Sequence, residues 1–168
     1  MKTILCMLVF STMAFSQGGT APRFELFGGA SYLPSDSMDF PRENSFGFQT
    51  NITGNINRWF GITGDFGGQY GKGPTSVYEY FVGPRFTKRL SRSSVFFNVL
   101  IGSAAGHTNR PGFSDQELAF GGGGGFDFQI SRRISIRPLQ VDYIGSFVDI
   151  LEDNLRFGSG IVFTFGGK

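Results

Sequence analysis

Residues Glu117–Ile130, ELAFGGGGGFDFQI, decide how the rest of the chain is interpreted. Phe120, Phe126 and Phe128 lie at even positions together with other apolar residues. The odd positions carry glycine, alanine or polar side chains such as Asp127. An alternation with a period of two indicates a β-strand. The polar face is narrow, as if it lined a crowded interior, and the bulky face needs apolar surroundings. A strand of a transmembrane barrel, with lipid outside and a polar lumen inside, has this arrangement.

The composition agrees with a membrane barrel of modest size. The 168 residues suffice for one domain, and they include 21 Phe and 26 Gly. The mean hydropathy is nevertheless near zero, at −0.04. The apolar residues are therefore dispersed among polar ones, which favours alternating strands over helical membrane spans.

The N-terminus resembles a secretory signal peptide over residues 1–16. Lys2 precedes an apolar run, and Ala14-Phe15-Ser16 forms a small-x-small cleavage site. Cleavage there removes Cys6, the only cysteine, so we expect no disulfide and no cysteine-based metal site. Without Lys2, 14 basic and 13 acidic residues remain, and nothing indicates nucleic-acid binding.

The same alternation recurs in seven further segments of the chain. The expected strands, besides Glu117–Ile130, are Arg23–Leu33, Ser45–Ile56, Trp59–Tyr70, Val77–Lys88, Ser94–Ala105, Ile134–Phe147 and Leu155–Phe165. Strands of this length span a hydrocarbon layer, which needs about 9–11 tilted residues. We therefore predict an all-β fold, an eight-stranded antiparallel up-and-down transmembrane β-barrel over residues 23–165.

Two local features refine this prediction. The alternation changes phase at Pro138, where a β-bulge would keep Arg137, Gln140 and Asp142 all facing inward. The connections alternate between short basic turns and mostly longer polar loops, the rule for periplasmic turns and outer loops in such barrels. We expect three of the outer loops to form interaction surfaces: Pro34–Asn44, Gly106–Gln116 and Val148–Asn154.

In these respects the chain resembles the small eight-stranded outer-membrane barrels of the OmpA/OmpX-like class, and more loosely the outer membrane protein beta-barrel domain family. The resemblance rests on the aromatic and glycine alternation, the turn asymmetry and the closing strand with its terminal Phe165. It implies a place in a bacterial outer membrane, with membrane lipids and the barrel-assembly machinery as partners. Such proteins commonly end at that aromatic residue, whereas Gly166-Gly167-Lys168 follow it here.

Charged residues also occur at positions that face the lumen. An eight-stranded barrel is just wide enough inside to be filled by side chains, so charges there must be paired. We therefore predict a lumen plugged by an ion-pair network, with the pairing left open and Glu117 near a rim. Its members are Glu25, Asp65, Glu79, Arg85, Asp127, Arg137, Asp142 and Arg156.

The expected function is a structural or interaction role through the outer loops, with no cofactor and an unidentified loop partner. One alternative is a small-solute pore through the charge pairs. Another is an outer-membrane lipid-modifying enzyme that uses His107, beside Thr108, with Ser114, Asp115 and Glu117. Loop spacing alone, however, does not define a catalytic triad. The third alternative is a soluble barrel with an apolar interior. It is disfavoured because the Phe and Tyr residues are expected to face outward.

Overall fold

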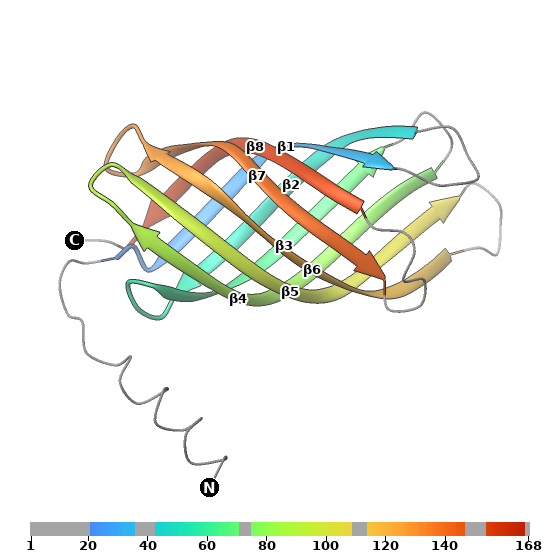
Figure 1. Ribbon diagram of the computed structural model, residues 1–168, viewed down its shortest axis with the longest axis horizontal. Coiled ribbons are helices and arrows are strands. Elements are labelled where there is room, and N and C mark those ends of the chain that lie inside the picture. The colour runs from blue at the N-terminus through green and yellow to red at the C-terminus, as the bar shows by residue number, and fades with distance from the viewer. Residues whose placement is uncertain (1–20, 36–42, 71–74, 109–113, 147–153, 167–168) are drawn as a thin grey trace, which may run out of the picture.

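The computed structural model describes residues 21–35, 43–70, 75–108, 114–146 and 154–166. They form one closed antiparallel barrel in which each strand pairs with its neighbours in the chain and β8 pairs with β1 (Figure 1). The predicted fold class is therefore confirmed. The strands are β1 (Phe24–Ser35), β2 (Glu43–Asn55), β3 (Phe60–Tyr70), β4 (Thr75–Arg89), β5 (Ser93–Thr108), β6 (Ser114–Gln129), β7 (Ile134–Ser146) and β8 (Asn154–Phe165).

The two faces of the wall have opposite chemistry. Large apolar side chains cover the outside, and Phe46 is 66% exposed and Leu118 61% exposed. The side chains of Arg137 and Arg156 point inward and are 0% exposed. Such a distribution, apolar outside and charged inside, suits a barrel surrounded by lipid and excludes a soluble barrel with an apolar interior. The inner face also has one small apolar cluster, formed by four residues of β4 to β7: Phe81, Leu100, Ala119 and Ile144.

The predicted bulge lies in β7. Its register shifts against both neighbouring strands, between Phe126 and Phe128 of β6 and between Arg137 and Gln140 of β7. Pro138 and Leu139 are two consecutive residues with exposed side chains in this bulge. Arg137 before them and Gln140 after them therefore both face the lumen. Proline is tolerated there because a bulge does not require its missing N–H in the ladder.

The strands extend further than the sequence pattern indicates. The predicted loops Pro34–Asn44 and Gly106–Gln116 are wrong at their edges, because β1 pairs with β2 up to Ser35 and Glu43, and β5 pairs with β6 up to His107 and Ser114. The predicted loop before Val77 is likewise shortened, since β4 begins at Thr75. The predicted loop Val148–Asn154 is wrong at its last residue, because β8 begins at Asn154. Beyond the hydrocarbon layer the backbone ladder can continue although the side chains no longer alternate, so periodicity does not detect these ends.

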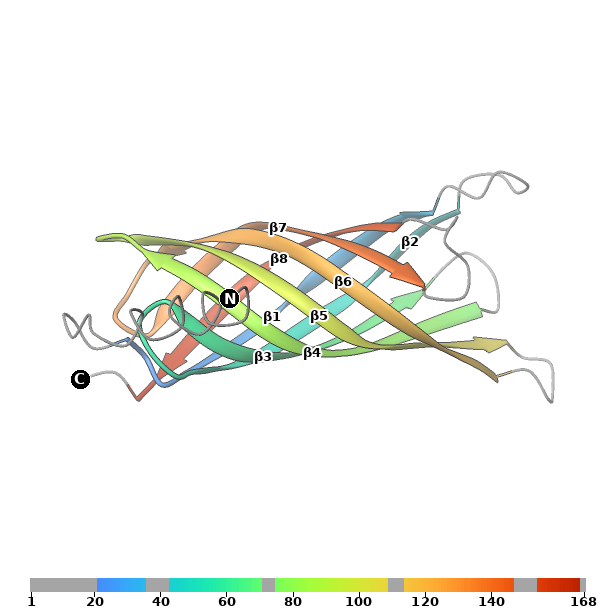
Figure 2. The same ribbon diagram turned by 60° about the horizontal axis from the view of Figure 1, so that its bottom comes forward.

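The two ends of the barrel differ. The three short turns, the start of β1 and the end of β8 lie together at one end, the turn side, and the longer connections lie at the other, the loop side (Figures 1 and 2). Among the described residues no helix is long and apolar enough to cross a bilayer. The predicted signal peptide, residues 1–16, lies outside the described part of the chain.

Candidate functional site: the charge network of the lumen

All eight charged residues singled out from the sequence lie inside the barrel. The least buried of them, Glu25, is 7% exposed, and the three arginines are 0–1% exposed. Isolated charges at such burial are costly, so their partners determine whether the interior is stable. The network comprises two clusters joined by amide side chains.

The turn-side cluster consists of Glu25, Arg85, Arg89, Asp127 and Arg137. Arg137 makes a bidentate contact with Asp127, with Nε to Oδ1 at 2.6 Å and Nη2 to Oδ2 at 3.1 Å. Arg89 donates to the Glu25 carboxylate. The Nη2 atom of Arg85 lies between the two carboxylates, 3.5 Å from Asp127 Oδ2 and 3.6 Å from Glu25 Oε2. Three cations thus surround two anions, and Arg85 is held least tightly.

The loop-side cluster consists of Asp65, Glu79, Asp142 and Arg156. The Arg156 guanidinium contacts all three carboxylates, with Nη1 2.8 Å from Glu79 Oε2 and Nη2 2.9 Å from both Asp65 Oδ1 and Asp142 Oδ2. These residues come from β3, β4, β7 and β8, so one guanidinium joins strands from opposite sides of the lumen. Three anions surround one cation, the reverse of the turn-side cluster.

Two amide side chains connect the clusters. Arg137 Nη1 donates to Asn51 Oδ1 at 2.9 Å and to Gln140 Oε1 at 2.7 Å. The amide nitrogen of Gln140 donates to Asp142 Oδ2 at 2.7 Å, and that of Asn51 donates to Asp65. Each amide therefore presents its oxygen to an arginine of one cluster and its nitrogen to a carboxylate of the other.

Gln49 adds a third amide within the loop-side cluster. Its nitrogen donates to Asp65 Oδ2 at 2.7 Å and to Asp142 Oδ2 at 3.0 Å. It is 1% exposed and belongs to β2. With these contacts the side-chain network runs without interruption from Arg89, near the turn-side opening, to Glu79 in the loop-side half.

Two buried aromatic rings support the arginines. The guanidinium carbon of Arg85 lies 3.7 Å from the centroid of the Phe96 ring, and that of Arg137 lies 4.2 Å from it. Arg137 also lies 4.3 Å from the centroid of Phe27. Cation–π contacts of this kind are strengthened where water is excluded. The strand with few polar inner residues, β5, thus contributes to the network through an aromatic face.

Sequence reasoning missed part of this arrangement. Arg89 appears in the sequence as a turn residue, but it is the last residue of β4 and reaches Glu25. The bridging amides Asn51 and Gln140 and the loop-side amide Gln49 lie on the expected inner faces, and their polarity inside a barrel was the available signal. Phe96 interrupts the polar inner face expected for its strand, but this interruption did not indicate a contact with the arginines.

An open vestibule leads into the barrel from the turn side. Its volume is about 760 Å³, and its lining includes Arg89, Arg132 and Arg133 together with Glu25 and Asp127 of the network. The vestibule therefore reaches the turn-side cluster. A space of this size is within the range of small-molecule sites, about 300–1,000 Å³.

The remaining candidate residues have no described side-chain geometry. The backbone register pairs His107 with Ser114 across β5 and β6, but the side chains of both residues, and of Asp115 and Glu117, lie outside what the structure describes. The enzyme alternative therefore stays a hypothesis of the sequence. Within the described residues, no group of three or more His, Cys, Asp or Glu side chains is arranged to hold a metal ion.

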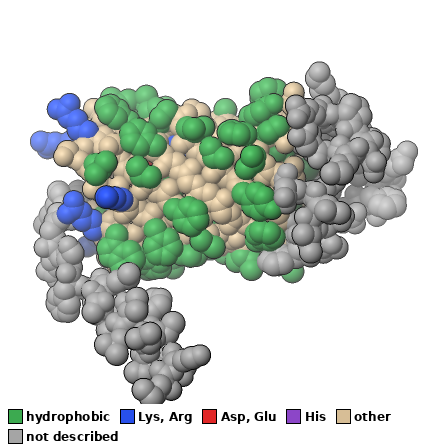
Figure 3. Space-filling model, viewed as in Figure 1, with side chains coloured by type: hydrophobic (Ala, Val, Ile, Leu, Met, Phe, Trp, Pro, Cys, Tyr) green, Lys and Arg blue, Asp and Glu red, His purple; other side chains and the backbone are tan. Residues whose placement is uncertain are grey.

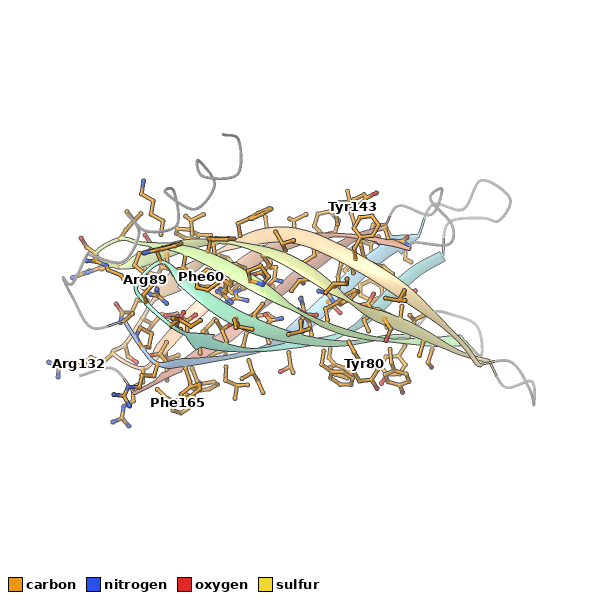
Figure 4. The ribbon with its side chains drawn as sticks, turned by 90° about the horizontal axis from the view of Figure 1, so that it is seen from below. Phe60, Tyr80, Arg89, Arg132, Tyr143 and Phe165 are labelled. Atoms are coloured by element: carbon orange, nitrogen blue, oxygen red, sulfur yellow. The ribbon has the colours of Figure 1, made fainter. Side chains whose placement is uncertain are left out.

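Aromatic rings on the outer surface contact one another toward both ends of the wall. At the turn side, the Trp59 ring lies 5.7 Å from that of Phe60 and 6.3 Å from that of Phe86. Toward the loop side, the rings of Phe66 and Tyr80 are 5.0 Å apart. Figure 4 shows Phe60 and Tyr80 toward opposite ends of the barrel. The two groups have the placement of interfacial aromatic girdles.

No protein-family model and no curated protein sequence matches this chain. Its structure is similar to Neisserial surface protein A, with a TM-score of 0.72, 11% identity and coverage of 88% of this chain and 100% of that one. It is also similar to OprG from Pseudomonas aeruginosa, with a TM-score of 0.63, 11% identity and coverage of 91% and 100%. Ail, the attachment invasion locus protein of Yersinia pestis, matches with a TM-score of 0.55, 16% identity and coverage of 84% and 99%. The chain therefore has the fold of the small eight-stranded outer-membrane β-barrels.

Proposed function

We propose that this chain is an integral protein of a bacterial outer membrane, that its lumen is closed by the charge network, and that it acts through its outer loops as a structural or interaction protein. The observation that carries the proposal is the unbroken network of ion pairs and hydrogen bonds from Arg89 to Glu79. Polar or charged side chains of every strand except β5 build it, and β5 adds the Phe96 ring. An interior filled by paired charges has no free passage for a solute.

The energetics favour a rigid plug over an adjustable gate. Every link between the clusters involves a buried charged group, and removing one partner of such a pair typically costs about 3–5 kcal/mol. Opening a path would require several of these links to break together. Functional variation is thereby left to the connections outside the membrane, where loops of this kind commonly carry binding residues.

The charges in the sequence of the loop-side connections indicate what kind of partner they favour. Eight acidic and three basic residues lie within the connections of that side or at the adjoining strand ends: Asp36, Asp39, Glu43, Asp115, Glu117, Asp149, Glu152 and Asp153, against Arg42, Lys72 and Arg110. A structure of Ail has been described in complex with the heparin analogue sucrose octasulfate. An acidic loop side does not favour a polyanion of that kind, so we expect the partner of this chain to be neutral or basic.

A small-solute pore is a second candidate because the vestibule already opens about 760 Å³ of the turn-side half. A pore would need the turn-side cluster to move away from the end of that vestibule. The bidentate contact between Arg137 and Asp127 opposes this movement.

The membrane placement is tested by extraction and gel mobility. We expect the chain to sediment with the outer-membrane fraction, to need detergent for extraction, and to migrate differently before and after boiling, as a folded barrel does. A chain recovered in the aqueous fraction without detergent contradicts the proposal.

The role of the loops is tested by complementing a deletion strain. One variant replaces residues 36–42, 109–113 and 147–153 with short Gly-Ser linkers, and a matched control replaces the turn residues 131–133 at the opposite end. We expect both to fold, and only the loop variant to lose complementation. Full complementation by the loop variant contradicts an interaction role.

A further inference from the structure

The exposed charges of the barrel form a basic collar at the turn side. We use this name for six exposed residues: Arg23, Arg58, Lys88, Arg92, Arg132 and Arg133. Among the residues whose side chains the structure describes, every exposed Asp, Glu, Lys or Arg belongs to this collar. The five described acidic side chains are all buried in the lumen. Figure 3 shows Lys and Arg gathered at this end and hydrophobic side chains along the rest of the wall.

The backbone of the collar is tied to neighbouring strands. Asn55 N donates to Arg23 O, Gln129 N donates to Arg92 O, and Thr164 N donates to Arg133 O, at 2.8–2.9 Å. In the same ring Thr87, which precedes Lys88, donates through its N–H to Trp59 O. The backbone that carries these cations is therefore anchored to the turn-side end of the barrel wall.

The collar borders the apolar part of the wall. Phe24 and Phe165, beside it on β1 and β8, are 57% and 51% exposed. The ring of Trp59, in the turn before β3, and those of Phe60 on β3 and Phe86 on β4 lie next to it. Figure 4 shows Phe165 and Arg132 at the same end of the barrel. Aromatic girdles lie at the level of the lipid headgroups, so the adjoining cations lie at that level too.

We propose that the basic collar binds the phosphate groups of anionic phospholipids in the leaflet that faces the short turns. The proposal rests on the membrane placement of the previous section. Lipid headgroups are the groups that surround a barrel laterally at this height, and a basic cluster at a membrane surface attracts anionic lipid. The loop-side connections are net acidic in sequence, whereas the collar is basic. We therefore expect anionic lipid to be held at the turn side only.

The single tryptophan of the chain, Trp59, reports on the collar directly. The whole barrel is inserted into vesicles that contain brominated phosphatidylglycerol or brominated phosphatidylcholine, and the quenching of Trp59 fluorescence gives the relative binding of the two lipids. We expect phosphatidylglycerol to be preferred about threefold or more, and the preference to fall as salt is added.

Paired variants localise the effect. Lys88→Gln with Arg92→Gln removes two cations around the turn between β4 and β5, which lies beside Trp59 because Thr87 N donates to Trp59 O. Arg58 remains in this variant, and we expect the preference at Trp59 to fall by at least half. Arg132→Gln with Arg133→Gln removes the same charge from the turn between β6 and β7, across the barrel, and should leave most of the preference. Heat-modifiable gel migration of both variants verifies that they fold.

The possible outcomes separate this proposal from the membrane placement. Quenching by neither lipid shows that the barrel has not inserted and contradicts the proposed placement. Equal quenching by both lipids overturns the collar proposal alone. Collar-dependent sedimentation with isolated peptidoglycan, without a lipid preference, also overturns it and assigns the cations to a cell-wall polymer.

Discussion

The two halves of the lumen both bury charged side chains, but their clusters have net charges of opposite sign. The turn-side cluster has three arginines against two carboxylates, whereas the loop-side cluster has one arginine against three carboxylates. Neither cluster is balanced alone, and the nine charges together leave one excess negative charge. The bridging amides are oriented by this difference, because Asn51 and Gln140 accept from Arg137 and donate toward the carboxylates. The plug is therefore one unit whose halves depend on each other.

The difference also changes how much each arginine should contribute. Arg156 is the only cation of its cluster, and all its carboxylate contacts are 2.8–2.9 Å. Arg85 shares its carboxylates with Arg89 and Arg137, and its own contacts are 3.2 Å to Thr53 and 3.5–3.6 Å to the carboxylates. The Nε atoms of both arginines have no hydrogen-bond partner among the described residues, so the difference lies in their Nη contacts. Two arginines of equal burial are thus far from equivalent.

The largest effect is expected from removing the single cation of the loop-side cluster. Arg156→Met leaves three buried carboxylates without a counter-charge, and we expect the free energy of unfolding to fall by about 3–5 kcal/mol. Arg85→Met is the matched control, with a loss of about 1–3 kcal/mol because its bonds are long and two arginines remain. Urea titration of the barrel in vesicles, followed by Trp59 fluorescence, measures both. Equal losses would refute the asymmetry.

Neutralising one carboxylate in each cluster should give results of different size. Asp127→Asn breaks the bidentate contact with Arg137 and leaves three cations against Glu25 alone, so we expect a loss of about 2–4 kcal/mol. Glu79→Gln keeps an oxygen for Arg156 and relieves the excess of negative charge, so we expect a change within about 1 kcal/mol of zero. The same unfolding titration compares them. A larger loss for Glu79→Gln than for Asp127→Asn would show that charge balance does not govern the interior.

A smaller effect is expected at the amide that joins two loop-side carboxylates. Gln49→Leu removes the donor to Asp65 and Asp142 while keeping a side chain of similar length, and we expect a loss of about 1–3 kcal/mol. The double variant Gln49→Leu with Arg156→Met tests whether the amide and the arginine act together. Additive losses would indicate independent contacts, whereas we expect coupling because both side chains bind the same two carboxylates.

The sequence was sufficient to predict the barrel because one rule governs every strand. Alternation located all eight strands, and the phase change at Pro138 located the bulge of β7. The loop-side ends of β1, β2, β4, β5 and β6 extend two or three residues beyond the prediction, since lipid no longer selects side chains there. The inner faces were also predictable, but the pairing was not. From the sequence Asp127 could have met Arg85, Arg137 or Arg156. The register of β6 and β7 at the bulge places Arg137 beside it, and Arg85 contacts it as well from β4.

Single-channel recording tests the central claim, that the two clusters and their amides close the lumen, most directly. The wild-type barrel in a planar bilayer should show no discrete conductance steps, because the network from Arg89 to Glu79 fills the interior. The Arg156→Met and Asp127→Asn variants, recorded in the same bilayers, should be the first to show transient openings. Stable, ion-conducting steps from the wild-type protein, unchanged by either substitution, would contradict the account.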